Sequence, residues 1–264
     1  MKNDMEAKKL EIIAGPCSAE SREQVLATAR QLRALGIGTF RAGLWKPRSR
    51  PGAFEGCGAQ ALPWLQEVQG LGMRVMTEVA LPEHVEAALA AGVDGLWIGA
   101  RTVVNPFLMD RLAEVLAGTE VPVFVKNPVC PDLELWTGAV ERLLQRRAGR
   151  LTAIFRGFCV EDSGIYRNAP LWHYVRLFRE RFPQLPVYCD PSHIAGRREL
   201  VGPLCREAAG EGVDGFFIES HVEPDAALSD ARQQLTPAEL GALLAALERE
   251  AGCALRLSAV SAGG

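Results

Sequence analysis

Four residues of metal-ligating type stand at widely separated points of the sequence: Cys17, His193, Glu219 and Asp230. A thiolate, an imidazole and two carboxylates suit a borderline divalent ion such as Mn²⁺, Fe²⁺, Co²⁺ or Zn²⁺. The alternative is a buried cysteine, a capping histidine and two solvated acids, and spacing alone favours neither. Glu219 weakens that alternative, because it directly follows the apolar run Phe216–Ile218. We therefore expect one divalent ion at an open catalytic site rather than at a closed structural one.

A second group of candidate residues is cationic. The segment 40–56 reads FRAGLWKPRSRPGAFEG and holds four cations and two stiffening prolines: Arg41, Lys46, Pro47, Arg48, Arg50 and Pro51. A run of this kind is usually a solvated basic patch, but three further cations each follow a different apolar run: Arg101, Lys126 and Arg156. So many cations at one site would repel one another unless a ligand with several negative charges neutralised them. Arginine matches phosphate and carboxylate oxygens in bidentate fashion, so the pattern predicts substrates carrying more than one phosphate.

Eight short apolar runs position these residues, and a candidate functional residue lies at or just past the end of almost every run. The runs are Leu10–Ala14, Gly38–Phe40, Arg74–Thr77, Gly95–Ile98, Val121–Val125, Leu151–Phe155, Pro186–Cys189 and Gly215–Ile218. Segments of helical character lie between them. Eight strand–helix units in about 250 residues predict a single-domain α/β fold, the (β/α)8 TIM barrel, whose active site lies at the carboxyl ends of the strands. Strands one, seven and eight neighbour each other in a closed barrel, so the four candidate ligands can converge.

The helical segments predict eight helices and a simple domain organisation. We expect helices over residues 21–35, 60–68, 82–91, 105–116, 134–147, 170–182, 197–209 and 236–250. Thr236, Pro237 and Glu239 form a capping-box signature for the last helix. We expect an N-terminal extension over residues 1–9, the catalytic barrel over 10–251 and a C-terminal tail over 252–264 that is frayed from Ser258.

Composition narrows the possible functions. The 264 residues are 48% apolar, enough for a large core, and a net charge of −3 argues against general nucleic-acid binding. Seven cysteines without a CxxC pair indicate neither a zinc ribbon nor a disulfide framework. The first nine residues lack the apolar centre of a signal peptide, and no apolar run approaches the roughly 18 residues of a membrane span. We therefore expect a cytoplasmic protein that does not bind membranes.

Several motifs together resemble the 3-deoxy-D-arabino-heptulosonate-7-phosphate (DAHP) synthases, transferases that begin the shikimate pathway of aromatic amino acid biosynthesis. They are AGPCS at 14–18, FRAGLWKPRSRP at 40–51, WIGAR at 97–101, CDPSH at 189–193, IESH at 218–221 and ALSDARQ at 227–233. The resemblance spans about residues 10 to 250 and is most similar to the core-only branch, which shares ancestry with the 3-deoxy-octulosonate 8-phosphate synthases. The segments VKNPVCPDLELW and FRGF resemble members fused to chorismate mutase.

The resemblance implies metal-dependent, aldol-type condensation of phosphoenolpyruvate with erythrose 4-phosphate, with release of phosphate. Cys17, His193, Glu219 and Asp230 match the metal ligands. The matching substrate residues are Arg41 and Lys46 for the carboxylate and aldehyde, Arg101, Lys126 and Arg156 for the phosphate of phosphoenolpyruvate, and Pro47, Arg48 and Ser49 for the sugar phosphate. Lys46 can donate a proton to the growing alkoxide, and Glu78 matches an acid near phosphoenolpyruvate that could activate the attacking water.

The sequence departs from the family motifs at two points, and two alternative functions remain. Many family members read KPRTSP where residues 46–51 read KPRSRP, so Arg50 has no implied role, and the Cys-Glu of one subgroup is Ile154-Phe155 here. The nearest alternative is a 3-deoxy-octulosonate 8-phosphate synthase that accepts arabinose 5-phosphate. That relative typically has Lys-Ala-Asn-Arg-Ser-Ser in the second loop, so Lys46-Pro47-Arg48 argues against it. The other alternative is a non-catalytic barrel that retained the pocket.

Regulation and assembly are expected from the resemblance alone. We expect a homo-oligomer, a dimer or a tetramer, with a possible chorismate mutase partner. The short segments that flank the expected barrel predict that the isolated chain is insensitive to aromatic amino acids and prephenate.

Overall fold

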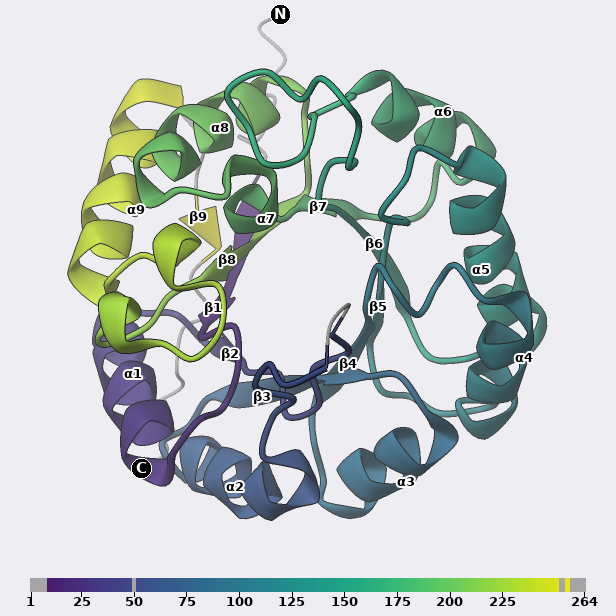
Figure 1. Ribbon diagram of the computed structural model, residues 1–264, viewed down its shortest axis with the longest axis horizontal. Coiled ribbons are helices and arrows are strands. Elements are labelled where there is room, and N and C mark those ends of the chain that lie inside the picture. The colour runs from purple at the N-terminus through teal and green to yellow at the C-terminus, as the bar shows by residue number, and fades with distance from the viewer. Residues whose placement is uncertain (1–8, 49–50, 252–254, 257–264) are drawn as a thin grey trace, which may run out of the picture.

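Eight parallel strands close into a barrel, because β1 pairs with β2 on one side and with β8 on the other. The computed structural model describes residues 9–48, 51–251 and 255–256, and Figure 1 views the barrel end-on, with the helices in a ring around the strands. This confirms the (β/α)8 fold, and each observed strand lies within two residues of its predicted bounds. The strands are β1 (Leu10–Gly15), β2 (Thr39–Arg41), β3 (Arg74–Val79), β4 (Gly95–Ile98), β5 (Val123–Lys126), β6 (Leu151–Phe155), β7 (Val187–Cys189) and β8 (Gly215–Glu219).

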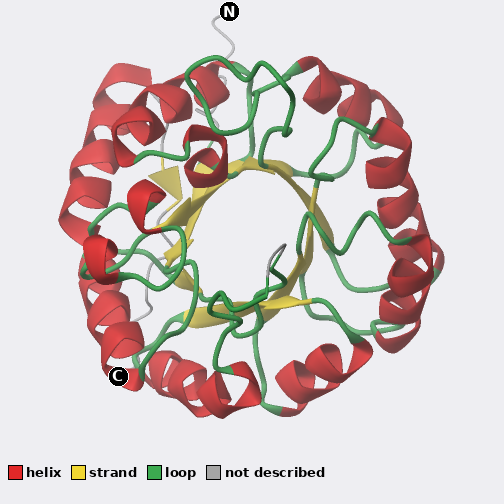
Figure 2. Ribbon diagram, in the orientation of Figure 1, coloured by secondary structure: helices red, strands yellow, loops and turns green. Residues whose placement is uncertain are grey.

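The helices form an outer layer that encloses the strands on all sides (Figure 2). They are α1 (Arg22–Ala34), α2 (Leu62–Gly70), α3 (Pro82–Ala90), α4 (Pro106–Val115), α5 (Leu133–Gln145), α6 (His173–Arg181), α7 (Pro191–Ala195), α8 (Arg198–Gly210) and α9 (Pro237–Ala251). Short 3₁₀ turns lie at Gly58–Ala61, Pro224–Ala226 and Ala231–Gln233. Within the described ranges, no helix combines the length and apolar character needed to cross a membrane.

Polar side chains fix where the helices begin. Ser21, Asn105 and Asp132 accept hydrogen bonds from the first-turn N–H groups of α1, α4 and α5. The predicted capping box of α9 is present: Thr236 Oγ1 accepts from the N–H of Glu239 at 3.2 Å, and Glu239 Oε2 accepts from the N–H of Thr236 at 2.7 Å. These caps set the helix ends, and so the length of the loops that carry the site.

Two elements were not predicted. The helix α7 is only five residues long and follows β7 directly, with Asp190 as its N-cap. The strand β9 (Leu255–Arg256) pairs with Leu10 and Glu11 of β1, inside the segment expected as a tail. Residues 258–264, which we expected to be frayed, lie outside the described residues.

The barrel interior is layered, because alternate residues of each strand point inward. A large apolar core fills the space between strands and helices, and a separate apolar cluster fills the middle of the barrel: Ile13, Met76, Trp97, Phe124, Ile154, Tyr188 and Phe217. Two residues further along these seven strands, and at Arg41 on β2, every inward position is charged or glycine: Gly15, Arg41, Glu78, Gly99, Lys126, Arg156, Asp190 and Glu219. The fold therefore places these inward-facing charged side chains in one layer at the carboxyl ends of the strands.

Candidate metal and anion site

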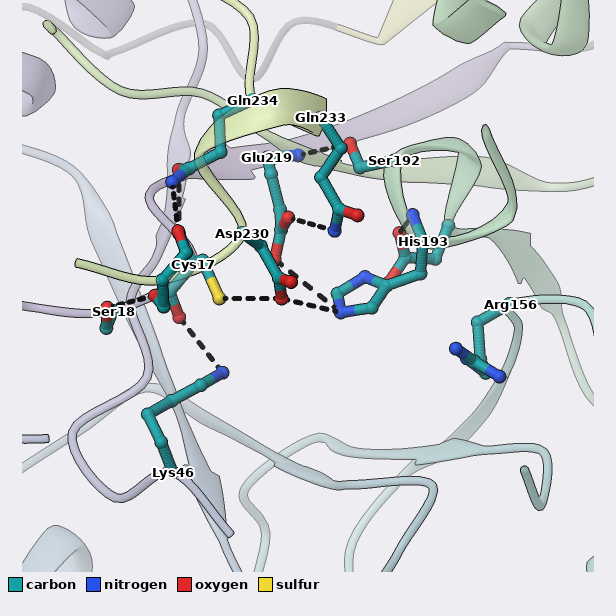
Figure 3. A network of polar contacts seen from close by, with 12 residues as sticks. Cys17, Ser18, Lys46, Arg156, Ser192, His193, Glu219, Asp230, Gln233 and Gln234 are labelled. Atoms are coloured by element: carbon teal, nitrogen blue, oxygen red, sulfur yellow. Dashed lines mark hydrogen bonds and ion pairs between the residues drawn. The ribbon is translucent and has the colours of Figure 1, made fainter. Parts of the chain in front are cut away.

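The four predicted metal ligands meet in that layer. Atoms of Cys17, Glu219 and Asp230 lie within 4.8 Å of one another, with Cys17 Sγ 3.4 Å from Asp230 Oδ2. The ring of His193 reaches the same point, since its Nε2 is 3.7 Å from Glu219 Oε1 and 3.8 Å from Asp230 Oδ2. Figure 3 shows the four side chains pointing toward one another. Cys17 follows β1, His193 lies on α7 after β7, Glu219 ends β8, and Asp230 lies in the loop after β8.

The electrostatics of this cluster fit a divalent cation. Burial and the neighbouring charge of Glu219 raise the pKa of the Cys17 thiol well above its ordinary value. Burial alone would raise the pKa of Asp230 too, but His193 and Arg167 outweigh it and lower that pKa. Burial lowers the pKa of His193, which favours the neutral, ligating imidazole. A divalent ion would supply the positive charge that a buried thiolate between two acids needs.

His193 is held by an acid to which the sequence analysis gave no role. Asp190 Oδ1 accepts the backbone N–H of His193 at 3.0 Å, and its Oδ2 lies 2.8 Å from the ring Nδ1. The same Oδ2 accepts a hydrogen bond from Lys126 Nζ at 2.7 Å. Burial would raise the pKa of Asp190, but His193 and Lys126 outweigh it and hold the pKa well below its ordinary value. Asp190 thus joins the metal candidates to the cation group.

Several of the cations are paired with acids. The sequence analysis expected the cations to repel one another unless a ligand neutralised them, and it did not anticipate these pairs. Lys46 Nζ lies 3.2 Å from Glu78 Oε2, and Arg41 Nη2 lies 3.4 Å from Glu219 Oε1. Gly99 makes room for Glu78, because a Cβ there would lie 2.1 Å from Glu78 Oε1. These pairs offset only part of the positive charge that the cations carry.

The floor of the site is aromatic. The guanidinium carbon of Arg41 lies 4.8 Å from the ring centre of Trp97 and 4.5 Å from that of Phe217, a cation–π arrangement. Arg41 is fully buried, and its Nε and Nη1 find no hydrogen-bond partner among the described residues. Unpaired buried donors are costly, so these two atoms are suited to an anionic ligand.

A cavity of about 180 Å³, here called the mouth cavity, opens above these groups. Its lining includes most of the predicted substrate residues: Lys46, Pro47, Arg48, Arg101, Lys126 and Arg156. Burial lowers the pKa of Arg156 to about 10, still well above neutrality. Arg48 Nε donates to the carbonyl of Phe54 at 2.7 Å, which holds its loop. The predicted substrate residue Ser49 and the unassigned Arg50 lie outside the described residues.

Further residues that hold the site also escaped the sequence analysis. Gln234 accepts the backbone N–H of Cys17 at 3.0 Å, and Ser192 Oγ accepts that of Glu219 at 2.9 Å. Arg167 and Gln233 contact Asp230 and Glu219. Gln233 ends the ALSDARQ motif and Gln234 directly follows it, so this motif was the sequence feature that could have pointed to the two glutamines.

Comparison with known proteins places this site in a family. The DAHP synthetase I family model matches residues 5–252. A phospho-2-dehydro-3-deoxyheptonate aldolase of Thermotoga maritima is 36% identical over 225 residues, which cover 85% of this chain and 64% of that protein. A 2-dehydro-3-deoxyphosphooctonate aldolase of Campylobacter jejuni is 28% identical over 257 residues, covering 86% of this chain and 91% of that protein.

Solved structures agree with the sequence comparisons. The crystal structure of the Thermotoga maritima DAHP synthase superposes with a TM-score of 0.82 at 31% identity, covering 96% of this chain and 73% of that one. A truncated form of the same organism's enzyme gives a TM-score of 0.79 at 29% identity, covering 96% of this chain and 92% of that one. The similarity therefore extends over nearly the whole barrel.

Proposed function

The chain belongs to the DAHP synthetase I family, and from that premise we propose that it is a transferase that condenses phosphoenolpyruvate with erythrose 4-phosphate. One water adds to the second carbon of phosphoenolpyruvate as phosphate leaves, so the products are 3-deoxy-D-arabino-heptulosonate 7-phosphate and phosphate, the first step of the shikimate pathway. The observation that carries the proposal is the meeting of four metal-ligating side chains, two of which, His193 and Asp230, line the mouth cavity together with a group of cations. Neither set alone would indicate a reaction between two phosphorylated substrates.

The cations suit phosphoenolpyruvate, which carries a carboxylate and a phosphate; Arg41, Lys126 and Arg156 are buried and Arg101 is exposed. In this proposal Arg101, Lys126 and Arg156 hold the phosphate, and the unpartnered donors of Arg41 take the carboxylate. Fixing both ends presents the nucleophilic carbon of the enol in one orientation, which lowers the entropic part of the barrier. Arg48 and Ser49 hold the phosphate of the acceptor sugar.

Lys46 is the proposed proton donor. Its Nζ lies 3.2 Å from Glu78 and 3.2 Å from the carbonyl of Cys17, so it stands between the phosphoenolpyruvate residues and the metal candidates. There it can donate to the acceptor's oxygen as the carbon–carbon bond forms. Burial would raise the pKa of Glu78, but Lys46 and Lys126 outweigh it and lower that pKa, so Glu78 remains the charged partner that orients Lys46.

Cys17, His193, Glu219 and Asp230 would hold one divalent ion, and such an ion polarises the aldehyde oxygen as a Lewis acid. Mn²⁺, Fe²⁺, Co²⁺ and Zn²⁺ all suit these donors. We also propose, as finer points of the same function, a cytoplasmic location, a dimer or tetramer, and a possible chorismate mutase partner.

The test is a phosphate-release assay on protein reloaded with each metal in turn, using phosphoenolpyruvate with either of two acceptors. The second candidate is the octulosonate reaction, since a 2-dehydro-3-deoxyphosphooctonate aldolase at 28% identity is among the relatives. We expect erythrose 4-phosphate to exceed arabinose 5-phosphate by at least about tenfold in kcat/KM, about 1.4 kcal/mol. Equal values would contradict the choice of acceptor, and no phosphate release with either sugar would support a non-catalytic barrel.

A further inference from the structure

Three of the four proposed metal ligands have one polar atom held from outside the cluster and another facing its centre. Glu219 Oε2 accepts from Gln233 Nε2 at 2.6 Å, which leaves Oε1 toward His193. Asp230 Oδ1 accepts from Arg167 Nη1 at 2.9 Å, which leaves Oδ2 toward Cys17. The ring Nδ1 of His193 lies 2.8 Å from Asp190 Oδ2, an ion-pair contact outside the cluster, and its Nε2 faces the centre. Outer contacts of this kind fix the direction of a ligand's lone pair before an ion binds.

Arg167 connects two of these outer contacts. Its Nη1 donates to Gln233 Oε1 at 2.8 Å as well as to Asp230. Arginine can only donate and an ionised carboxylate can only accept, so the Gln233 amide between them has one favourable orientation. Its oxygen faces Arg167 and its nitrogen faces Glu219. The arginine therefore acts on Asp230 directly and on Glu219 through the amide.

Asp230 needs such a hold, because its backbone is strained. Its φ of 48° and ψ of 34° lie in the left-handed region, which non-glycine residues seldom adopt. Backbone strain of this type persists where surrounding contacts determine it. Arg167 and the 3₁₀ turn Ala231–Gln233 supply those contacts.

The position of Arg167 links the metal candidates to the substrate cavity. It follows β6, lines the mouth cavity and keeps 45% of its side chain exposed. The next residue, Asn168, accepts from Arg156 at 3.1 Å and donates to the carbonyl of His193 at 2.6 Å. Gly196, at the end of α7, leaves room for the arginine, because a Cβ there would lie 2.4 Å from Arg167 Cβ.

We propose that Arg167 and Gln233 are positioning residues that orient Asp230 and Glu219 for the metal ion. The inference rests on the proposed metal site. The competing explanation is a structural ion pair, but Arg167 keeps 45% of its side chain exposed, and solvent weakens a pair with so exposed a partner. The two explanations therefore differ in what they predict for metal affinity in a folded protein.

The experiment titrates Co²⁺ into the metal-free full chain and follows the thiolate-to-cobalt absorption band, with affinity measured against a competing chelator. The variants are Arg167→Met, Arg167→Lys and Gln233→Leu, and Arg232→Met is the matched control, an exposed arginine of the same 3₁₀ turn. We expect Arg167→Met and Gln233→Leu to weaken Co²⁺ binding about ten- to one-hundred-fold. Arg167→Lys should recover part of the affinity, and Arg232→Met should bind as the wild type does.

A double-mutant cycle tests the connection between the two residues. If Arg167 acts on Glu219 through Gln233, the double variant loses less affinity than the product of the two single losses. Wild-type affinity in both single variants would overturn the inference while leaving the metal site intact. A wild-type protein that shows no thiolate band would overturn the metal site, and the inference with it. Thermal unfolding in chelator should change little in all variants, and a large loss in Arg167→Met would favour the structural explanation.

Discussion

The two ends of the barrel interior use charged residues in opposite ways. At the carboxyl ends, Arg41 and Glu219 form a pair whose side chains are 0% exposed. At the amino ends, Arg74 and Glu11 form a pair whose side chains are 52% and 26% exposed. The apolar middle layer, with Trp97 and Phe217, separates the two. The barrel therefore carries a dehydrated charge cluster at one end and a hydrated ion pair at the other.

Cavity size alone would have located the site at the wrong end. The cavity at the amino ends, lined by Glu11, Arg74 and Tyr188, measures about 750 Å³, against about 180 Å³ for the mouth cavity. Burying ion pairs costs desolvation free energy that a stable fold can avoid. Charges are therefore buried where chemistry requires them, and in barrels of this class that is the carboxyl end.

The prediction with the largest expected effect concerns the proposed metal ion and one of its proposed ligands. Chelation, or His193→Ala, should lower kcat by at least about a thousandfold, roughly 4 kcal/mol of barrier, because the Lewis acid is lost. Circular dichroism should show an intact barrel, and a divalent ion should restore the chelated wild type. Full turnover of a verified metal-free sample would remove the metal from the mechanism.

A second test asks what the buried charges contribute to stability. Asp190→Asn leaves Lys126 buried without its charged partner, so we expect the free energy of unfolding in chelator to fall by about 3 kcal/mol. Adding Lys126→Met should recover part of that loss, since it removes the unpaired charge. Urea titrations of the single and double variants measure both quantities. A double variant less stable than Asp190→Asn would argue against the pair.

The same pair predicts a dependence on acid. The pKa of Asp190 is held below its ordinary value of 3.8, so its contribution is present above that pH. The contribution is lost as the pH falls toward the lowered folded-state pKa. The gap in unfolding free energy between the wild type and Asp190→Asn should therefore narrow in acid, and a gap that stays constant down to pH 2 would contradict the assignment.

Sequence patterns predicted the barrel and the convergence of the four candidate metal ligands, because both depend on local information. Each strand is a short apolar run, and Cys17 and Glu219 lie where such runs end. The outer contacts depend on long-range geometry. Arg167 and Asp230 are 63 positions apart and lie in different loops, so no local spacing relates them. Asp190 was missed for another reason: it lies inside the motif CDPSH, yet only the folded chain shows that it faces both Lys126 and His193.

At the amino ends, the predicted effects are smaller and concern stability alone. Tyr188 donates to Glu11 Oε2 at 2.7 Å. Tyr188→Phe removes this hydrogen bond and should lower the free energy of unfolding by about 1 kcal/mol. The kcat and both KM values should be unchanged, because Tyr188 lines the cavity at the amino ends and not the mouth cavity. A changed KM for phosphoenolpyruvate would show that the two ends of the barrel are coupled.

The last expected effect appears only in alkali, and it is the mirror image of the acid effect at Asp190. Burial and the hydrogen bond to Glu11 raise the pKa of Tyr188 above its ordinary value of 10.0. The phenol's contribution to stability is therefore complete below pH 10 and is lost as the pH rises, because only the unfolded chain ionises there. Above pH 10 the wild type should lose up to about 1.4 kcal/mol per pH unit more than Tyr188→Phe. Urea titrations of both proteins at several alkaline pH values, with every other tyrosine and lysine in common, isolate this one group. Parallel curves would mean that Tyr188 has the same pKa in the folded and the unfolded chain. The burial of this phenol would then have no effect on its titration, unlike the burial of Asp190 at the carboxyl end.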